Sequence, residues 1–542
     1  MKYLLTGVAA IAMLTACGQK DKPGEAAAPQ GVVFSQEKIP AFKVQDGDPA
    51  TAAAALAAMA LENSGDGDVS WAGKQVTGDK AVFTDVTLVS DEDADGDALN
   101  LDGADLKAGK MELDGLGMKD GAASFSRLLL SDVSLVPDDP EDASKGSGSI
   151  GSVELVNPSP ETVAWVAAMF KTGDASDLPE GAALSFDQWS LKDIDFRVDD
   201  PEGEQGTFTV KTVEVTGLKD QKAALMKLDG MAFDMTDTAE GTDMTLNLGA
   251  VELRGADLGL LTSAGEDASD PEDVTRMMNL AAQDPANPGY ESLTIDGFDL
   301  DLAGVKIDLP KLVSAVGRDK KDSVVAVKTE PFKVTLSTGE GKYGEELASQ
   351  LALLGYETVE LTGSGYQTYE PATDLTTFVK GKNYWDVKDG FHLDFGMQYA
   401  GARAIAQAEA SQQQAMNTDP TAVFNSTLDN MTLHNIEFAL DDNGLLDRAF
   451  NAYAAQSGQD PQEVRNQVTG LLAMAPMMAS GSGVDAELIT EASTALSSFV
   501  STPKTLTIKM APAQPLALST LANMDDPSQL TKETLGFSAT NE

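Results

Sequence analysis

The sequence is poor in the residues that carry redox, zinc and nucleophilic chemistry. It has one cysteine, Cys17, and two histidines, His392 and His434, among 542 residues. One cysteine excludes an intrachain disulfide and a CxxC metal site. The histidines stand in "GFHLDF" and "TLHNIEF", and neither belongs to an HExxH zinc motif. The sequence also has no GxSxG nucleophile elbow and no GxxxxGK[ST] phosphate loop, so we expect a protein that is not an enzyme.

Positive charge and aromatic residues are scarce as well. The chain has 38 Lys and Arg against 86 Asp and Glu, for a net charge of −48. Such a surface repels phosphate backbones, which excludes nucleic-acid binding. Four tryptophans give little support for an aromatic-lined sugar cleft. A carboxylate-based hydrolase stays open as an alternative, because 86 acidic residues are too many to single out a catalytic pair.

Long apolar runs are absent, and the run at the start of the chain is short. Leu4 to Leu14 follows Lys2 and is too short for a bilayer span of about 20 residues. Small residues follow it, which is typical of a secretory signal over residues 1–16. The last four residues of this stretch, Leu14-Thr15-Ala16-Cys17, resemble the lipobox of bacterial lipoproteins. The resemblance implies cleavage before Cys17, a diacylglyceryl group on its sulfur and a fatty acyl chain such as palmitate on the new amino terminus.

This anchor sets the expected location of the protein. Several acyl chains hold a protein stably on a membrane, since each buried methylene contributes about 0.8 kcal/mol. Gly18 follows Cys17, where inner-membrane lipoproteins of enteric bacteria carry aspartate, so we expect the outer membrane of a bacterial envelope. Residues 18–31, "GQKDKPGEAAAPQG", are polar and rich in Pro and Gly. They predict a flexible tether over 17–47 that ends where the folded body begins at residue 48.

The body contains many short runs in which apolar and polar residues alternate, such as "TFTVKTVEV" at 207–215. Alternation with period two indicates half-buried strands. One six-residue signature recurs: apolar, any, Asp/Asn/Gly, apolar, any, apolar. Its copies begin at Phe83, Leu101, Leu113, Leu130, Leu191, Leu228, Leu253, Ile295 and Leu433.

The spacing of this signature is unusual for a strand. Residues three apart in a regular strand point to opposite faces, yet positions one and four are both apolar. A one-residue bulge restores them to one face, and Asp, Asn and Gly tolerate the backbone it needs. A tight turn between two strands is the alternative. Both alternatives predict an extended, curved antiparallel sheet in a mostly β, α+β fold.

Helices interrupt the predicted sheet. Ser159-Pro160-Glu161 begins one that ends near Gly173, and further helices are expected near 269–283 and 344–354. A strand block follows each, so we predict a loose repeat of helix and strands over 48–400. Residues 401–542 predict a mixed α/β region with three helices between 442 and 499 and a last strand at 505–512. The methionines of 474–478 are interpreted as core filling, with a lipid groove as the alternative.

The strongest candidate for a metal site is "DEDADGDALNLD", residues 91–102. Asp91, Asp93 and Asp95 stand at positions 1, 3 and 5 of a calcium loop, Gly96 at 6 and Asp102 at 12, and Asp97 adds a carboxylate. The flanks read as strands, where an EF-hand has helices, and position 12 is aspartate. A solvated acidic hairpin is the alternative, and calcium is the one cofactor that we consider.

The bent strands and Leu-rich helices of residues 65–440 weakly resemble AsmA-like envelope proteins. That resemblance implies a long curved sheet with an apolar groove and a role in lipid handling. We therefore predict a non-enzymatic, lipid-anchored envelope protein that serves as a scaffold or binds lipid, with the membrane and a lipid or envelope protein as partners. A calcium-dependent surface adhesion module is the alternative from another class.

Overall fold

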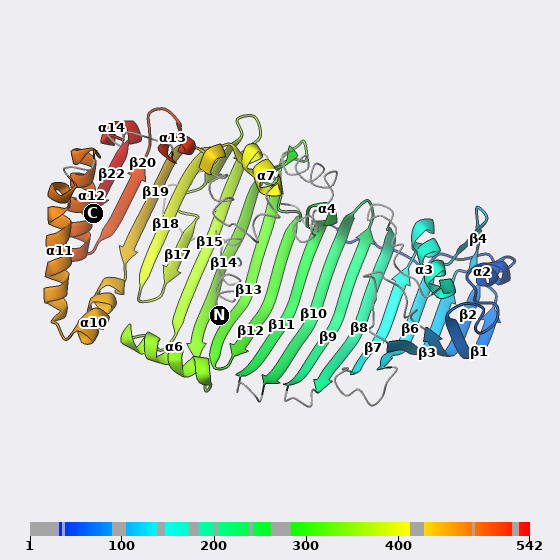
Figure 1. Cartoon of the computed structure of the whole chain (residues 1–542). Coiled ribbons are helices and arrows are strands. Elements are labelled where there is room, and N and C mark those ends of the chain that lie inside the picture. The colour runs from blue at the N-terminus through cyan, green and yellow to red at the C-terminus, as the bar shows by residue number, and fades with distance from the viewer. Residues whose placement is uncertain are drawn as a thin grey trace. The chain divides into compact units, whose positions relative to one another are not determined.

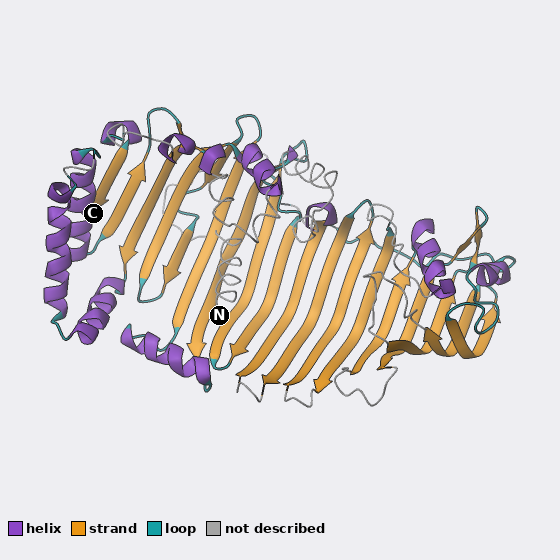
Figure 2. Ribbon diagram, in the orientation of Figure 1, coloured by secondary structure: helices purple, strands orange, loops and turns teal. Residues whose placement is uncertain are grey.

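The computed structural model describes residues 32–34, 38–88, 104–137, 147–172, 184–199, 204–237, 242–261, 283–411, 428–479, 483–522 and 530–542. The chain divides into two compact units. We call residues 36–259 with 289–304 the N-terminal unit, and residues 1–35, 260–288 and 305–542 the C-terminal unit. Both are built on antiparallel strands with several helices, which confirms the predicted fold class (Figures 1 and 2).

The strands of the N-terminal unit lie in the order β1-β2-β3-β6-β7-β8-β9-β10-β11-β12, each antiparallel to the next. A separate hairpin, β4–β5, extends from β3 and β6. The bounds are α2 (Ala52–Ala58), β1 (Val69–Thr77), β2 (Lys80–Leu88), β3 (Ala104–Asp114), β4 (Gly117–Lys119), β5 (Ala122–Ser124), β6 (Arg127–Pro137), β7 (Ser147–Val156), α3 (Pro160–Thr172), β8 (Phe186–Asp199), β9 (Glu204–Leu218), β10 (Lys222–Asp237), β11 (Thr242–Asp257), α4 (Leu258–Leu261) and β12 (Ser292–Leu302).

A first row of interrupted pairing crosses this sheet. Between β2 and β3, for example, Thr84 pairs with Lys110 and Val86 with Ala108, while Asp85 and Gly109 between them are skipped. The same step recurs on each following strand pair, always without a change of register. The skipped residues, which we call the first corner row, are Ala72, Asp85, Gly109, Asp132, Gly151, Asp193, Lys211, Gly230, Gly249 and Gly297.

Every second strand turns through a left-handed residue in this row. The φ angles are 51° at Asp85, 54° at Asp132, 53° at Asp193, 63° at Gly230 and 66° at Gly297. Only Gly, and less readily Asn or Asp, adopts this conformation without a large steric cost. Figure 1 shows neighbouring strands such as β9, β10 and β11 bending at matching levels.

A second corner row lies six positions further along the strands, towards the β1–β2 turn. Here the left-handed residues fall on the other strands, with φ of 63° at Gly78, 66° at Gly115, 47° at Asn157, 66° at Gly217 and 58° at Gly255. Their cross-strand neighbours complete the row. These are Asp79, Ser126, Asp187, Ala224 and Glu291.

The predicted signature marks both rows, because its third position is the left-handed residue. The copies that begin at Phe83, Leu130, Leu191, Leu228 and Ile295 place it in the first row, and those at Leu113 and Leu253 place it in the second. Neither predicted alternative describes the copies of the first row, since the strand continues through the row and its register is unchanged. For the copy at Leu113, Gly115 lies between the end of β3 at Asp114 and the start of β4 at Gly117, as the turn alternative predicts. The bulge is correct for the copy at Leu433, where Gln398 pairs with Asn435 and Tyr399 with Leu433, leaving His434 extra. The copy at Leu101 has its third position outside the described residues.

The corners keep apolar side chains on one face of the sheet. Trp71 lies beside Val86 on one side of the first row and Phe83 lies on the other side, yet the rings of Trp71 and Phe83 are 4.8 Å apart between centroids. Phe83 and Val86, positions one and four of the signature, are both fully buried in the same cluster. Positions one and four thus share a face, as the sequence predicted.

Two helices cover this face at β1 to β7. Ala55 and Leu56 of α2 and Val166 and Phe170 of α3 belong to the cluster that contains Phe83. Helix α3 begins as predicted, with the Ser159 hydroxyl accepting a hydrogen bond from the backbone N–H of Thr162 at 3.2 Å. The cluster extends as far as Trp189 of β8.

Residues 38–48 lie across the second corner row. Asn157 Nδ2 donates to Lys43 O at 2.9 Å, and the backbone N–H of Gly47 donates to Asp79 Oδ2 at 2.8 Å. Pro40 lies against Gly217, so a Cβ there would be 3.1 Å from Pro40 Cγ. The C-terminal part of the predicted tether, residues 38–47, is therefore fixed to the sheet.

The C-terminal unit pairs β13-β14-β15, then β16 and β17 between β15 and β18, then β18-β19-β20-β22, with β21 beside β19. The bounds are β13 (Val305–Arg318), β14 (Val324–Thr338), α6 (Lys342–Leu353), β15 (Val359–Glu370), β16 (Leu375–Phe378), β17 (Tyr384–Val387), β18 (Phe391–Ala400), α7 (Ala402–Ser411), β19 (Thr432–Asp442), α10 (Leu445–Ser457), α11 (Pro461–Met478), α12 (Ala486–Ser501), β20 (Thr505–Met510), β21 (Leu516–Ala517), α13 (Leu518–Ala522), α14 (Lys532–Leu535) and β22 (Phe537–Asn541).

The three predicted C-terminal helices correspond to α10, α11 and α12, and the strand predicted at 505–512 to β20. It is not the last strand, because β21 and β22 follow it. Asp460 caps α11 by accepting from the N–H groups of Gln462 and Glu463, and Pro461 is its first residue. The division predicted at residue 400 differs from the structure, in which Val305–Glu542 lies in one compact unit. The helix predicted over 269–283 lies outside the described residues, apart from residue 283.

Candidate functional site

One face of β8 to β12 carries a broad field of apolar side chains. Three rows of cross-strand neighbours form it, and we call them together the inner apolar face. Next to the first corner row they are Leu191, Val213, Leu228, Val251 and Ile295 on one side and Ile194, Val210, Met231, Leu248 and Phe298 on the other, followed by Phe196, Phe208, Phe233, Leu246 and Leu300. Directly paired residues point to the same side of a sheet, so each row is continuous.

Most of these side chains are only half-buried. Val210 and Leu300 have exposed fractions of 2% and 7%, and Ile194 has 7%, whereas the other members fall between buried and exposed. The rings of Phe196 and Phe208 stack with centroids 6.4 Å apart. Half-buried apolar residues in a continuous field are typical of a surface that receives an apolar ligand. The field is therefore the best candidate for binding.

The opposite face is polar. The residues that alternate with the inner rows include Asp195, Thr209, Ala232, Asn247 and Asp299. Asp195 is held by Arg197, whose Nε and Nη2 donate to its two oxygens at 3.0 and 3.1 Å. Hydrogen bonding to Arg197, together with its positive charge, lowers the pKa of the Asp195 carboxyl. The sheet thus has one apolar and one charged face.

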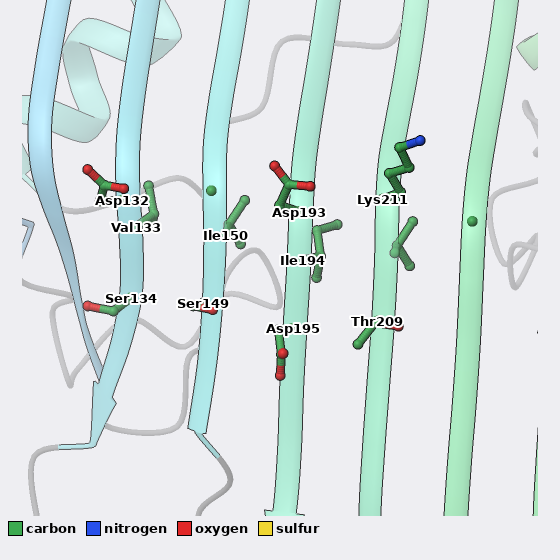
Figure 3. Close-up of a pocket in the computed structure, with 13 residues that line it drawn as sticks. Asp132, Val133, Ser134, Ser149, Ile150, Asp193, Ile194, Asp195, Thr209 and Lys211 are labelled. Carbon is green, nitrogen blue, oxygen red and sulfur yellow. The ribbon is translucent and has the colours of Figure 1, made fainter.

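A shallow depression of about 640 Å³ follows the first corner row between β6 and β10 (Figure 3). Asp132 of β6, Asp193 of β8 and Lys211 of β9 stand along it, and all three are exposed. The side chains of the two aspartates lie over glycines of β3 and β7. A Cβ at Gly109 would be 3.2 Å from Asp132 Cβ, and one at Gly151 would be 3.0 Å from Asp193 Cβ.

These distances give the corner residues a structural role. Aspartate in the left-handed conformation occupies the space beside the neighbouring strand, so that strand has glycine at the facing position. Within the residues that the structure describes, no three His, Cys, Asp or Glu side chains come together as a possible metal site. The depression therefore has the geometry of a bend in the sheet, and its carboxylates do not converge.

The predicted site residues are not placed by the structure. Cys17 and the calcium candidates Asp91, Asp93, Asp95, Asp97 and Asp102 lie outside the described residues. The flanks of the acidic loop are strands, as predicted, since β2 ends at Leu88, β3 begins at Ala104, and the two pair antiparallel. The calcium interpretation stays a prediction.

The two histidines stand apart from any cluster of reactive groups among the described residues. His392 Nδ1 lies 3.2 Å from Asp386 Oδ2, and its ring packs against Tyr384 with centroids 5.2 Å apart. This is a cross-strand pair between β17 and β18. His434 is the extra residue of the β19 bulge.

Sequence reasoning missed two features of the surface. It marked seven left-handed positions of the two rows but missed Gly78, Asn157 and Gly217, which the signature does not cover. It also missed partners such as Gly151 and Lys211, because these belong to strands without the signature. It also placed the methionines of α11 in a core, whereas Met474, Met477 and Met478 are 44%, 69% and 73% exposed. That interpretation is wrong for these three residues.

Comparisons with known proteins place part of the chain. A family model described as "Uncharacterized protein" matches residues 384–542, which lie in the C-terminal unit. A search of curated proteins finds no match. None of the described helices combines the length and apolarity that a membrane span requires.

Proposed function

We propose that the protein is a lipid-anchored component of a bacterial envelope that binds lipid acyl chains on its inner apolar face, without catalysing a reaction. The observation that carries the proposal is the continuity of half-buried apolar rows across β8 to β12. The lipobox resemblance at Leu14 to Cys17 supports the location, and the lack of catalytic motifs supports a binding role.

The strand geometry suits an acyl chain. Neighbouring strands lie about 4.8 Å apart, so the field from β8 to β12 is on the order of 19 Å wide. Each methylene removed from water on such a surface contributes about 0.8 kcal/mol. The corners hold the rows on both sides of the bend on one face, so that a chain contacts apolar groups along its whole length.

The charge of the protein favours acyl recognition over headgroup recognition. Basic residues are few, with 38 Lys and Arg against 86 Asp and Glu. A phosphate headgroup is best bound by arginine forks and clustered lysines. The inner rows contain none, so specificity is expected to depend on the length of the acyl chain.

Native mass spectrometry of the full-length protein, purified in a mild detergent, tests the proposal. We expect co-purified lipid on the wild type and none on Phe233→Asp. We expect Ala232→Asp to retain the lipid, because residue 232 is next to Phe233 but its side chain points to the polar face. Circular dichroism of both variants checks that the sheet is intact. Wild-type protein without lipid, or equal lipid on the two variants, would contradict acyl binding and leave a scaffold role.

A further inference from the structure

The C-terminal end of α11 carries four exposed apolar side chains, which we call the α11 apolar tip. Leu471 is 57% exposed, Met474 44%, Met477 69% and Met478 73%. They stand within eight consecutive residues of one helix. Large apolar groups gathered on a surface are typical of an interaction site.

The helix geometry places these residues together. Leu471, Met474 and Met478 are three and four positions apart, and residues at this spacing share one helix face. Met477 adjoins Met474 and Met478 in the same last turn. The other side of α11 packs on α12, and among its described residues only Val464 is buried (Figure 1). The apolar tip is thus presented outward.

The tip and the residues next to it in the sequence carry no charge. The sequence "NQVTGLLAMAPMMASGSGV", residues 466–484, contains no charged residue in a chain that is 23% charged. Arg465 precedes it and is held by Asp447. Asp485 and Glu487 follow at the start of α12. The backbone N–H groups of Lys532 and Glu487 donate hydrogen bonds to the Asp485 carboxyl and lower its pKa. This carboxyl is therefore anionic at neutral pH.

These charges select among the possible occupants. An anionic lipid surface is repelled by Asp485 and Glu487 at the start of α12, and it meets no lysine or arginine in the tip. A second copy brings another net charge of −48 to the contact. A zwitterionic lipid surface has no net charge, and flexible methionine side chains adapt to such an irregular apolar boundary.

We propose that the α11 apolar tip inserts into the interface of a neutral, zwitterionic lipid bilayer and gives the C-terminal unit its own contact with the membrane. The contact is separate from lipid bound on the inner apolar face, since it uses other residues of another unit. Four apolar side chains without a basic partner give a weak, reversible contact. The contact becomes effective when the acylated amino terminus raises the local concentration of lipid.

A dye at the tip tests the insertion directly. The Met477→Cys variant of the full-length protein is labelled with an environment-sensitive NBD dye and mixed with phosphatidylcholine vesicles. Leu353→Cys is the matched control, because Leu353 at the end of α6 is 48% exposed in the same unit. Wild type treated in the same way measures any label on Cys17.

We expect a blue shift of NBD emission and protection from iodide for Met477→Cys, and neither for Leu353→Cys. Replacing Leu471, Met474 and Met478 with glutamine in the Met477→Cys protein keeps helix propensity and is expected to lower vesicle affinity of the tip about tenfold or more. No shift with any vesicle overturns the proposal. A shift that needs anionic lipid overturns the proposal of a neutral bilayer as the partner. A concentration-dependent shift without vesicles also overturns it, because it shows self-association through the tip.

Discussion

Gly297 offers a direct measurement of what a corner contributes. Its φ is +66°, and a Cβ built there would meet only Gly249, with N at 3.6 Å and Cα at 3.7 Å. Gly297→Ala therefore adds no steric clash and changes the backbone preference alone. A non-glycine residue in the left-handed region costs roughly 1–2 kcal/mol, so we expect the free energy of unfolding to fall by about that amount.

Two further substitutions isolate the cause. Gly297→Asp is expected to cost less than Gly297→Ala, because aspartate occupies the same row at Asp85, Asp132 and Asp193 with φ of 51°, 54° and 53°. Gly206→Ala is the matched control in β9, with its nearest non-neighbouring atom at 3.8 Å and no left-handed φ. Alanine there is expected to be neutral or to stabilise by about 0.5–1 kcal/mol.

The assay is equilibrium urea unfolding followed by far-ultraviolet circular dichroism. Midpoints are compared among variants that share the slope of the wild type, because a changed slope reports a different unfolded or native state. The expected order of stability is Gly206→Ala, then Gly297→Asp, then Gly297→Ala. A Gly297→Ala protein as stable as Gly206→Ala would refute the argument that left-handed residues make the bend.

Three more outcomes follow from other parts of the molecule. Asn157→Gly keeps the left-handed backbone but removes the hydrogen bond to Lys43, so trypsin is expected to cleave after Lys43 at least several-fold faster than in the wild type. The pKa of Glu491 lies below its ordinary value, mainly because the Lys532 ammonium donates a hydrogen bond to its carboxylate. Its contribution to stability is complete above the unfolded pKa and is lost as the pH falls through the lower folded pKa. The difference in Tm between wild type and Glu491→Gln should therefore shrink as the pH falls below the ordinary range of glutamate, and vanish once the pH is below the folded pKa. A lipid-modified Cys17 has no free thiol, and stoichiometric maleimide labelling of the denatured protein would contradict the anchor.

The bends were predictable from the sequence because their cause is local. A residue such as Asp132 or Gly230 interrupts the alternation of its own strand, and the apolar residues on either side show that both must reach one face. The rows were not predictable, because they depend on which residues face each other. Asp193 meets Gly151, which is 42 positions away in the sequence, through the register of β7 and β8, and neither segment alone encodes that contact. Calcium at Asp93 and the lipid on Cys17 depend on local motifs and stay predictions.

The corner rows connect the packing of the sheet with the proposed binding of lipid. A strand that crossed this row without the skipped residue would move its next side chains to the other face, since alternation has period two. Val210 and Met231 would then point to the polar face, and the inner apolar face would end at the bend. Because all strands from β1 to β12 make the step at paired positions, the apolar rows stay continuous on both sides of it. In the proposed function, the Asp and Gly residues of the first corner row therefore act on lipid binding through the direction of their neighbours, without contacting the lipid.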